Sequence, residues 1–220
     1  MDRKGNLIVL SGFSGVGKGT VCKELIKKEG YCLSVSATTR DPRPKEQHGV
    51  DYFFLKKEEF LASIEQNGFL EYATYVGNYY GTPRRFVEDK LAAGENVILE
   101  IEVQGAMNIK KQYPDAILIF ITAPSAEVLK DRLVGRESET SDVITARLGR
   151  AVEEAAFIEA YDYIVCNESG QIEKCVEDIL HIIDVENTQV KHQKHFISQI
   201  RSDLQHFIAS KKTPTSISGE

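Results

Sequence analysis

The feature that most constrains this chain is a glycine-rich loop between an apolar run and a helical pattern. The loop reads Gly-Phe-Ser-Gly-Val-Gly-Lys-Gly-Thr from Gly12 to Thr20, after the apolar run Leu7–Leu10 and before apolar residues at helical spacing over 21–26. Glycines let backbone N–H groups turn towards one anionic centre, Lys18 adds a positive charge, and the helix N-terminus adds its partial positive end. A strand, loop and helix of this kind predict a site for nucleotide phosphates.

The residue after the lysine departs from the usual form of this motif. Ser or Thr commonly stands there and contacts Mg²⁺, whereas here Gly19 follows and the hydroxyl arrives one residue later, on Thr20. Thr20 is therefore one candidate for contacting Mg²⁺, and contact through water alone is the other, because Mg²⁺ keeps much of its hydration shell beside phosphates. The predicted phosphate-binding residues are Gly12, Phe13, Ser14, Gly15, Val16, Gly17, Lys18, Gly19 and Thr20.

Composition limits the size and the partners of the fold. The 220 residues, 42% of them hydrophobic, can bury one sizeable core but not two full domains. The formal net charge of -6 argues against a nucleic-acid partner, because a phosphate backbone favours a basic surface. Any binding of phosphate is therefore expected to be local.

Cysteine spacing and hydropathy predict a cytoplasmic protein. The 4 cysteines show no C-x-x-C spacing, which favours free thiols in a reducing compartment and argues against a zinc site. The N-terminal residues lead directly into a strand without a signal-peptide hydrophobic region, and no apolar run approaches membrane-spanning length. No membrane partner is expected.

Apolar strand patterns alternate with helical ones, which predicts an α/β fold with a parallel sheet flanked by helices. Between residues 34 and 82 the segments become shorter and rich in Tyr, Phe, Arg and Gly, as expected of an insertion built for binding. Strands are expected at 7–10, 97–103, 117–121 and 163–166, and helices near 18–29, 84–93, 125–134 and 141–159.

The last segment, from about residue 186, predicts an amphipathic helix followed by a polar tail. Its apolar side is expected either to pack on the chain's own core or to contact a second subunit, so monomer and homodimer are both open. The apolar residues at helical spacing are Phe196, Ile197, Ile200, Leu204, Phe207 and Ile208.

Five short motifs follow the loop in order: SVSATTRDPR from Ser34, GVDY from Gly49, FLEYA from Phe69, GNYYGT from Gly77 and LEIEVQG from Leu99. Together with the loop they closely resemble guanylate kinases over about residues 5–185. The resemblance implies a P-loop NTPase-type sheet with a small GMP-binding insertion and an arginine-bearing lid. The chain departs from the family's usual residues at Phe13 (usually Pro), Lys45 (usually Gly) and Glu102 (more often Asp).

These patterns divide the chain into a guanylate-kinase-like domain and a C-terminal extension. The domain is expected over 1–185, with its core at about 1–33 and 91–185, its GMP-binding insertion at about 34–90, its lid at about 124–150, and the helix and tail at 186–220.

Arg40 and Arg43 are three residues apart in a Pro-containing loop, so both guanidinium groups could converge on one phosphate. Tyr52 and Tyr80 would add phenolic donors to the same oxygens. In guanylate kinases the positions matching these four bind the phosphate of GMP.

Glu71 stands among apolar and aromatic residues, where a buried, unpaired carboxylate would be costly. Guanine offers N1–H and an exocyclic amine as two parallel donors to one carboxylate, and adenine offers no such pair, so Glu71 can carry base selectivity. The alternative is a solvated charge on a surface turn. Ser36 and Thr82 match family positions that contact the base beside it.

Two further acidic residues end an apolar strand. Glu100 and Glu102 are expected at the carboxyl edge of the sheet, around GMP, where they can orient Lys18 and hydrated Mg²⁺. The alternative is a solvated charge at the strand end.

Four arginines surround the polar stretch that begins at Glu137. Arg136 and Arg147 match family arginines that close over the ATP phosphates, and with Lys18 they are the expected catalytic residues. For Arg132 and Arg150, surface ion pairs and catalytic roles are both open.

The resemblance implies reversible, Mg²⁺-dependent transfer of the γ-phosphoryl group of ATP to GMP, with dGMP as a further acceptor. One alternative is an inactive guanylate-kinase-like module that binds partner proteins, which the retained Lys18 and arginines oppose. Another is a kinase for a different nucleoside monophosphate, which Glu71, Ser36 and Thr82 oppose.

Overall fold

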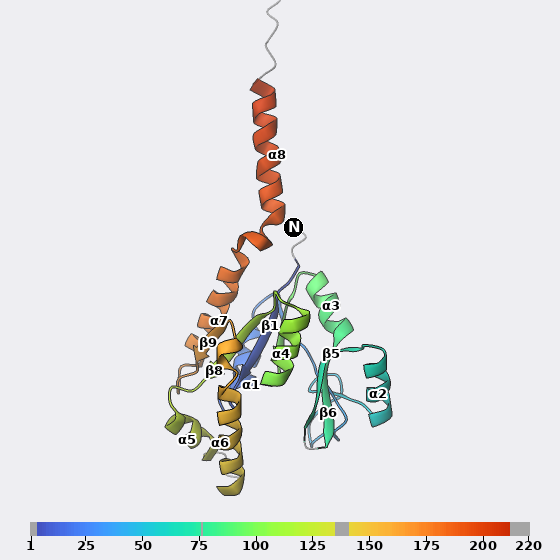
Figure 1. Ribbon diagram of the computed structural model, residues 1–220, viewed down its shortest axis with the longest axis vertical. Helices are drawn as coiled ribbons and strands as arrows, with labels where there is room; N and C mark the ends of the chain where they lie inside the picture. The colour runs from blue at the N-terminus through green and yellow to red at the C-terminus, as the bar shows by residue number, and fades with distance from the viewer. Residues whose placement is uncertain (1–3, 76, 135–140, 212–220) are drawn as a thin grey trace, which may run out of the picture. The chain divides into compact units, whose positions relative to one another are not determined.

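The computed structural model describes residues 4–75, 77–134 and 141–211 (Figure 1). They fall into two compact units, one up to Ile179 and one from Leu180. The strands are β1 (Leu7–Gly12), β2 (Tyr31–Leu33), β3 (Ala37–Thr38), β4 (Phe53–Phe54), β5 (Phe69–Tyr75), β6 (Asn78–Pro83), β7 (Asn96–Glu100), β8 (Ile117–Thr122) and β9 (Tyr163–Cys166). The helices are α1 (Lys18–Leu25), α2 (Lys57–Glu65), α3 (Arg84–Ala92), α4 (Val103–Gln112), α5 (Ala126–Val134), α6 (Ser141–Ala155), η1 (Ile158–Ala160), α7 (Ile172–Asn187), η2 (Val190–His192) and α8 (Lys194–Lys211).

Within the described part of the first unit, a five-stranded sheet has the order β2-β7-β1-β8-β9. All of its neighbouring strands are parallel, so the predicted α/β fold is confirmed. Parallel pairing brings the carboxyl ends of the strands to one edge, where β1 ends at Gly12 and β7 at Glu100.

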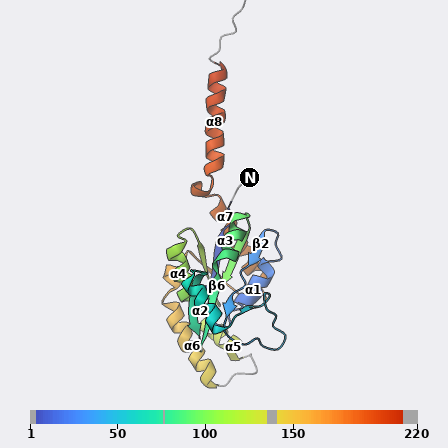
Figure 2. The same cartoon turned by 90° about the vertical axis from the view of Figure 1, so that its right-hand side faces the viewer.

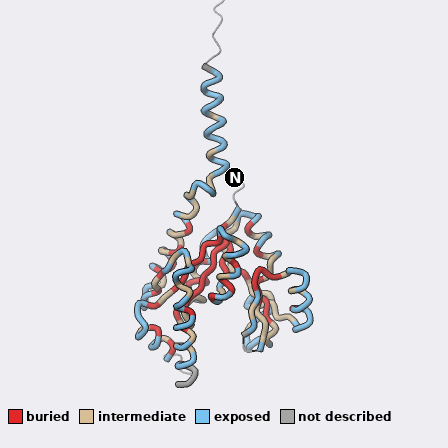
Figure 3. Tube along the Cα trace, in the orientation of Figure 1, coloured by how far each residue is buried: buried red, intermediate tan, exposed pale blue. Residues whose placement is uncertain are grey.

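This sheet is apolar on both faces because helices cover both. Every residue of β1 is buried, and successive side chains point to opposite sides. Leu7 and Val9 pack in a cluster with residues of α3 and α4, whereas α1 lies against the opposite face (Figures 1 and 2). Figure 3 shows that the buried residues concentrate in these central strands.

The insertion forms a second, smaller sheet with the order β4-β3-β6-β5. Its pairs β3–β6 and β5–β6 are antiparallel, and β3–β4 is parallel. Helix α2 closes one side through Phe60, whose ring stacks on Phe69 at 4.3 Å and on Tyr79 at 5.4 Å between centroids. The insertion thus has a small aromatic cluster of its own.

The structure corrects several boundaries that the sequence predicted. The strand expected over 97–103 ends at Glu100, and Val103 instead begins α4, which the sequence did not reveal because Gly105 is typical of a loop. Strand β2 and helices α2 and α7 were not predicted either. The helices expected at 18–29 and 141–159 end earlier, at Leu25 and Ala155.

The second unit contains the end of α7, then η2 and α8. The predicted C-terminal helix is confirmed, and α8 contains all six apolar residues that the sequence placed on one. The tail at 212–220 lies outside the described residues. No helix in the described ranges combines the length and apolarity needed to cross a membrane.

Leu118 is fully buried in β8, which lies between β1 and β9. We expect Leu118→Ala to lower the free energy of unfolding by about 2–5 kcal/mol, because it removes buried methyl groups and leaves a cavity. Ile164 on the adjacent β9 is 57% exposed, so Ile164→Ala should cost less than about 1 kcal/mol. Urea unfolding measures both changes, and equal losses would contradict the assigned core.

Candidate functional site: a nucleotide-binding edge of the sheet

The glycine-rich loop requires glycine at several points. Gly12, Gly15 and Gly17 have φ angles of 150°, 84° and 97°. A Cβ on Gly12 would also lie 2.1 Å from the carbonyl oxygen of Ile121, because the loop starts against the backbone of β8. Gly17 is the N-cap residue of α1. The loop therefore lies at a helix N-terminus, where backbone N–H groups favour an anion.

Lys18 folds back over this loop. Its Nζ donates hydrogen bonds to the carbonyl oxygens of Gly12 at 2.7 Å and Phe13 at 3.0 Å. Burial lowers the pKa of Lys18 below its ordinary value, and the charges of Glu100, Glu154 and Glu102 oppose that decrease. The ammonium group is thus held next to the loop by oxygen atoms.

Two residues distant in sequence, Arg132 and Asn167, donate hydrogen bonds to the loop at Val16. Asn167 Nδ2 donates to the Val16 carbonyl at 2.8 Å. Arg132 donates to the carbonyls of Val16 at 3.4 Å and Asn167 at 2.8 Å, and to the Ser169 hydroxyl at 3.1 Å. Arg132 therefore supports the loop backbone. This role differs from the two that the sequence left open, a surface ion pair and a catalytic role. The only sequence signal for Asn167 is its place just after β9, at the carboxyl edge of the sheet.

Two cavities lie at this edge and share part of their lining. One, of about 340 Å³, is lined by Lys18 and Arg147, and the other, of about 360 Å³, lies against the insertion. The residues that line both are Ser36, Tyr52, Glu100, Ile101 and Glu102.

Most of the residues predicted from the sequence line these cavities. Gly12, Ser14, Lys18 and Arg147 line the first, and the predicted residues of the second include Arg40, Arg43, Glu71 and Tyr80. Of the other predicted loop residues, Thr20 is exposed on the first turn of α1. Arg136 lies outside the described residues.

Glu71 is buried, with 9% of its surface exposed, so the alternative of a solvated surface charge was wrong. The Thr82 hydroxyl donates to Glu71 Oε1 at 2.7 Å. A Cβ on Gly105 would lie 2.9 Å from Oε2, which shows how closely the first turn of α4 packs on the carboxylate. Burial raises the pKa of Glu71, and the bond from Thr82 opposes the increase.

Glu46, which no sequence pattern indicated, lines the second cavity and pairs with Arg40. The two Arg40 terminal nitrogens donate to the two Glu46 oxygens at 2.9 and 3.1 Å. Glu46 Oε2 also accepts the backbone N–H of Arg43 at 2.7 Å. Lys45, which lies between Arg43 and Glu46, has a φ of 78°. This conformation favours glycine, which explains why the family usually has Gly at this position.

Arg150, on α6, pairs with Glu102, the N-cap residue of α4. Its Nη2 lies 2.6 Å from Glu102 Oε2, and its Nε lies 3.8 Å from Glu154 Oε1. Arg150 therefore makes ion pairs and lines the cavity together with Arg147. The pair with Glu102 involves the residue at which this chain departs from the family's usual Asp.

Comparison with known proteins shows which family this chain resembles. Residues 4–186 match the family model described as guanylate kinase. The chain belongs to the guanylate kinase family. It is 48% identical to a guanylate kinase of Clostridium acetobutylicum over 194 residues, which cover 88% of this chain and 92% of that protein.

Another guanylate kinase and a solved structure match similar shares of this chain. A guanylate kinase of Bacillus cereus is 48% identical over 205 residues, which cover 92% of this chain and 99% of that protein. A crystal structure of guanylate kinase from Anaplasma phagocytophilum superimposes with a TM-score of 0.69 at 34% identity, covering 86% of this chain and 89% of the other.

Members of an ATP-dependent kinase family generally use Mg²⁺, and the donor atoms here fit that ion. Among the described residues no group of three or more His, Cys, Asp or Glu side chains could enclose a metal. Glu100 and Glu102 nevertheless place carboxylate oxygens in the cavity that contains Lys18. Carboxylates of this kind, completed by phosphate oxygens and water, suit Mg²⁺, which rarely uses an all-protein cage.

The buried carboxyl of Glu71 should make the protein less stable at neutral pH. Its pKa is higher in the folded chain than its ordinary value of 4.5, so stability falls as the pH rises from 4.5 through the folded-state pKa. We expect Glu71→Gln to raise the free energy of unfolding at pH 7 on the order of 1 kcal/mol, because Gln keeps an acceptor for Thr82 without the buried charge.

Urea unfolding at pH 7 and pH 4 measures this effect. Most of the gain should disappear at pH 4, where the wild-type carboxyl is mostly protonated in both states. The matched control is Glu65→Gln, at an exposed position on α2, which should change stability at neither pH. A Glu71→Gln variant that is no more stable at pH 7 would show that the buried charge is fully compensated.

Proposed function

We propose that this chain catalyses the reversible transfer of the γ-phosphoryl group from ATP to GMP, giving ADP and GDP. The observation that carries the proposal is a buried carboxylate, Glu71, in the same cavity as Arg40, Arg43 and Tyr80, next to the cavity that contains Lys18. Relatives at 48% identity are named guanylate kinase, which supports the same reaction.

The second cavity would hold GMP. Its phosphate would contact Arg40, Arg43, Tyr52 and Tyr80, since guanidinium forks and phenolic hydroxyls are donors suited to phosphate oxygens. The guanine edge would place N1–H and its exocyclic amine on Glu71, as two donors to one buried carboxylate. Ser36 and Thr82 would lie beside the base.

The first cavity would hold the ATP phosphates on the loop backbone and Lys18. Arg147 would contribute a further positive charge, and Arg136, outside the described residues, is proposed on the family motif alone. Glu100 and Glu102 would hold Mg²⁺ through its water ligands, with direct contact from Thr20 as the alternative, and the bound ion would supply positive charge next to the phosphates. No general base is needed, because the acceptor phosphate is already anionic near neutral pH, so alignment and charge neutralisation suffice.

The proposal extends to the cellular compartment and to a second acceptor nucleotide. All four cysteines are free thiols, which suits a reducing compartment such as the cytoplasm. We propose dGMP as a second acceptor, because the contacts above involve the base and the phosphate. A protein-binding module without catalysis is less well supported, since such a module has no need for Lys18 over a phosphate-binding loop.

The test is ADP production from ATP and Mg²⁺ by the purified chain, with GMP, dGMP, AMP, CMP or UMP offered separately. Turnover restricted to the guanine nucleotides supports the proposal. Turnover with another acceptor would assign a different monophosphate kinase, and no turnover despite nucleotide binding would favour the binding module.

We expect Lys18→Met to lower kcat by about 10²–10³-fold, because it removes a positive charge placed where the transferring phosphoryl group develops negative charge. Nucleotide affinity should fall much less, since backbone N–H groups make most of the phosphate contacts. Steady-state kinetics with GMP and calorimetric ATP binding measure the two effects.

The matched control is Lys27→Met, whose side chain is 67% exposed and pairs with Glu24. It should leave both quantities unchanged. Near wild-type kcat in Lys18→Met would remove this lysine from the proposed chemistry.

A further inference from the structure

Strand β5 contains a bulge at the residue that we assign to guanine recognition. Phe69 pairs with Pro83 and Tyr72 with Gly81, so β5 advances three residues while β6 advances two. Leu70 and Glu71 therefore lie opposite the single residue Thr82. A bulge of this kind redirects a side chain and is common beside active sites.

Burial along β5 shows the effect of the bulge. Phe69, Leu70 and Glu71 are all buried, at 7%, 2% and 9% exposure, and in a regular strand Glu71 would share the face of Phe69 because side chains alternate. Phe69 packs in the aromatic cluster of the insertion, and Leu70 packs in the core cluster under α3 and α4. Glu71 is thereby turned towards Thr82 and Gly105.

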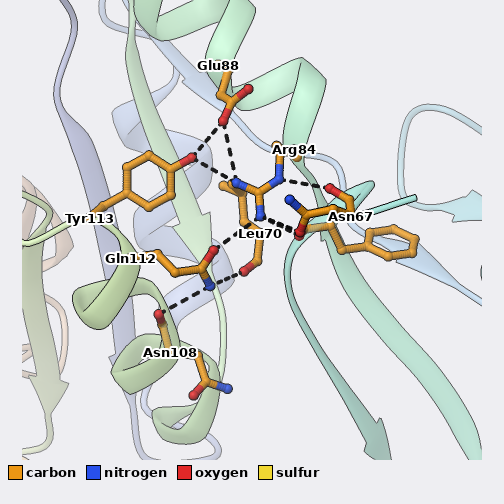
Figure 4. A network of polar contacts seen from close by, with 8 residues as sticks. Asn67, Leu70, Arg84, Glu88, Asn108, Gln112 and Tyr113 are labelled. Atoms are coloured by element: carbon orange, nitrogen blue, oxygen red, sulfur yellow. Dashed lines mark hydrogen bonds and ion pairs between the residues drawn. The ribbon is translucent and has the colours of Figure 1, made fainter. Parts of the chain in front are cut away.

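A bulge interrupts the ladder of hydrogen bonds, so its carbonyl groups need other partners. Figure 4 shows that two side chains from the core provide them. Arg84 Nη2 donates to the Phe69 carbonyl at 3.0 Å, and Gln112 Nε2 donates to the Leu70 carbonyl at 2.6 Å. The two side chains also meet each other, with Arg84 Nη2 3.2 Å from Gln112 Oε1.

The guanidinium group of Arg84 is itself fixed on its other sides. Its Nε and Nη2 donate to the carbonyl and side-chain oxygens of Asn67 at 2.9 and 3.1 Å. Its Nη1 lies 3.5 Å from Glu88 and 3.3 Å from the Tyr113 hydroxyl, which donates to Glu88 at 2.8 Å. Arg84 is the first residue of α3 and Gln112 the last of α4, so both act from rigid ends of core helices.

We propose that Arg84 and Gln112 are positioning residues that hold the β5 bulge and thereby aim the Glu71 carboxylate at the guanine base. They fix the backbone of the two residues directly before Glu71, while Thr82 and Gly105 confine its carboxylate. This inference rests on the proposed function, since it assigns a purpose to the orientation of Glu71.

Removing either side chain should leave the fold intact. Both line a hollow of about 460 Å³ at the surface, so water can replace their hydrogen bonds to the carbonyls. The bulge then loses its fixed position rather than its hydrogen bonding. A carboxylate that must meet two donors at once is sensitive to such a loss, because both bonds depend on one orientation.

The test compares binding of GMP with binding of IMP, which retains N1–H but lacks the exocyclic amine. We expect Arg84→Ala and Gln112→Ala each to weaken GMP binding roughly tenfold, less than the hundredfold that misplacement by an ångström can cause. IMP binding should weaken less, so the preference for GMP over IMP falls, and ATP binding should stay unchanged. Calorimetry with each nucleotide alone measures all three affinities without requiring turnover.

The chain offers a matched control beside each position. Arg85→Ala removes an arginine whose side chain is 95% exposed, and Lys111→Ala removes an exposed residue next to Gln112. Both controls should bind all three nucleotides like the wild type.

A double-mutant cycle separates positioning from a general structural role. In a Glu71→Gln background, adding Arg84→Ala should weaken GMP binding by less than twofold, since the group that it positions is already altered. A loss as large as in the wild-type background, or equal losses for GMP, IMP and ATP, would overturn the inference. Failure of the wild type to prefer GMP over AMP would instead overturn the proposed function, whatever the Arg84 variants do.

Discussion

The site depends on keeping several charged groups compensated in a partly buried space, because an unpaired charge removed from water is costly. Lys18 donates to two loop carbonyls, Arg40 pairs with both oxygens of Glu46, and Arg150 pairs with Glu102. Each cation therefore already faces oxygen atoms in a defined geometry. Nucleotide phosphates would exchange one set of oxygen acceptors for another, so binding needs little reorganisation of charge.

The backbone makes this concentration of charge possible. Parallel strands end together, and the pairing of Gly12 with Ile121, which leaves no space for a Cβ, fixes where the loop leaves the sheet. Arg132 and Asn167 then hold the loop at Val16. Lys18 is thus held on the first turn of α1, a helix whose buried residues pack on the central sheet.

Local patterns in the sequence were sufficient to predict the loop and four of the five strands of the parallel sheet, because a glycine-rich turn and apolar segments are properties of neighbouring residues, whereas the edge strand β2 was not predicted. The gathering of Arg40, Tyr80 and Glu71 in one cavity was expected from the family resemblance. Asn167 could not be predicted, since it contacts Val16 across 151 positions. The pairing of Arg40 with Glu46 was missed because several acidic residues flank that loop, and only tertiary geometry selects among them.

The β5 bulge also constrains the length of the chain. Deleting one of the two bulge residues, Leu70 or Glu71, would leave a single residue opposite Thr82, and that residue could not both fill the core cluster and present a carboxylate. Insertions and deletions between Phe69 and Tyr72 are therefore far more harmful than apolar substitutions at Leu70, so a change of substrate base should arise here by replacing Glu71 rather than by shifting it.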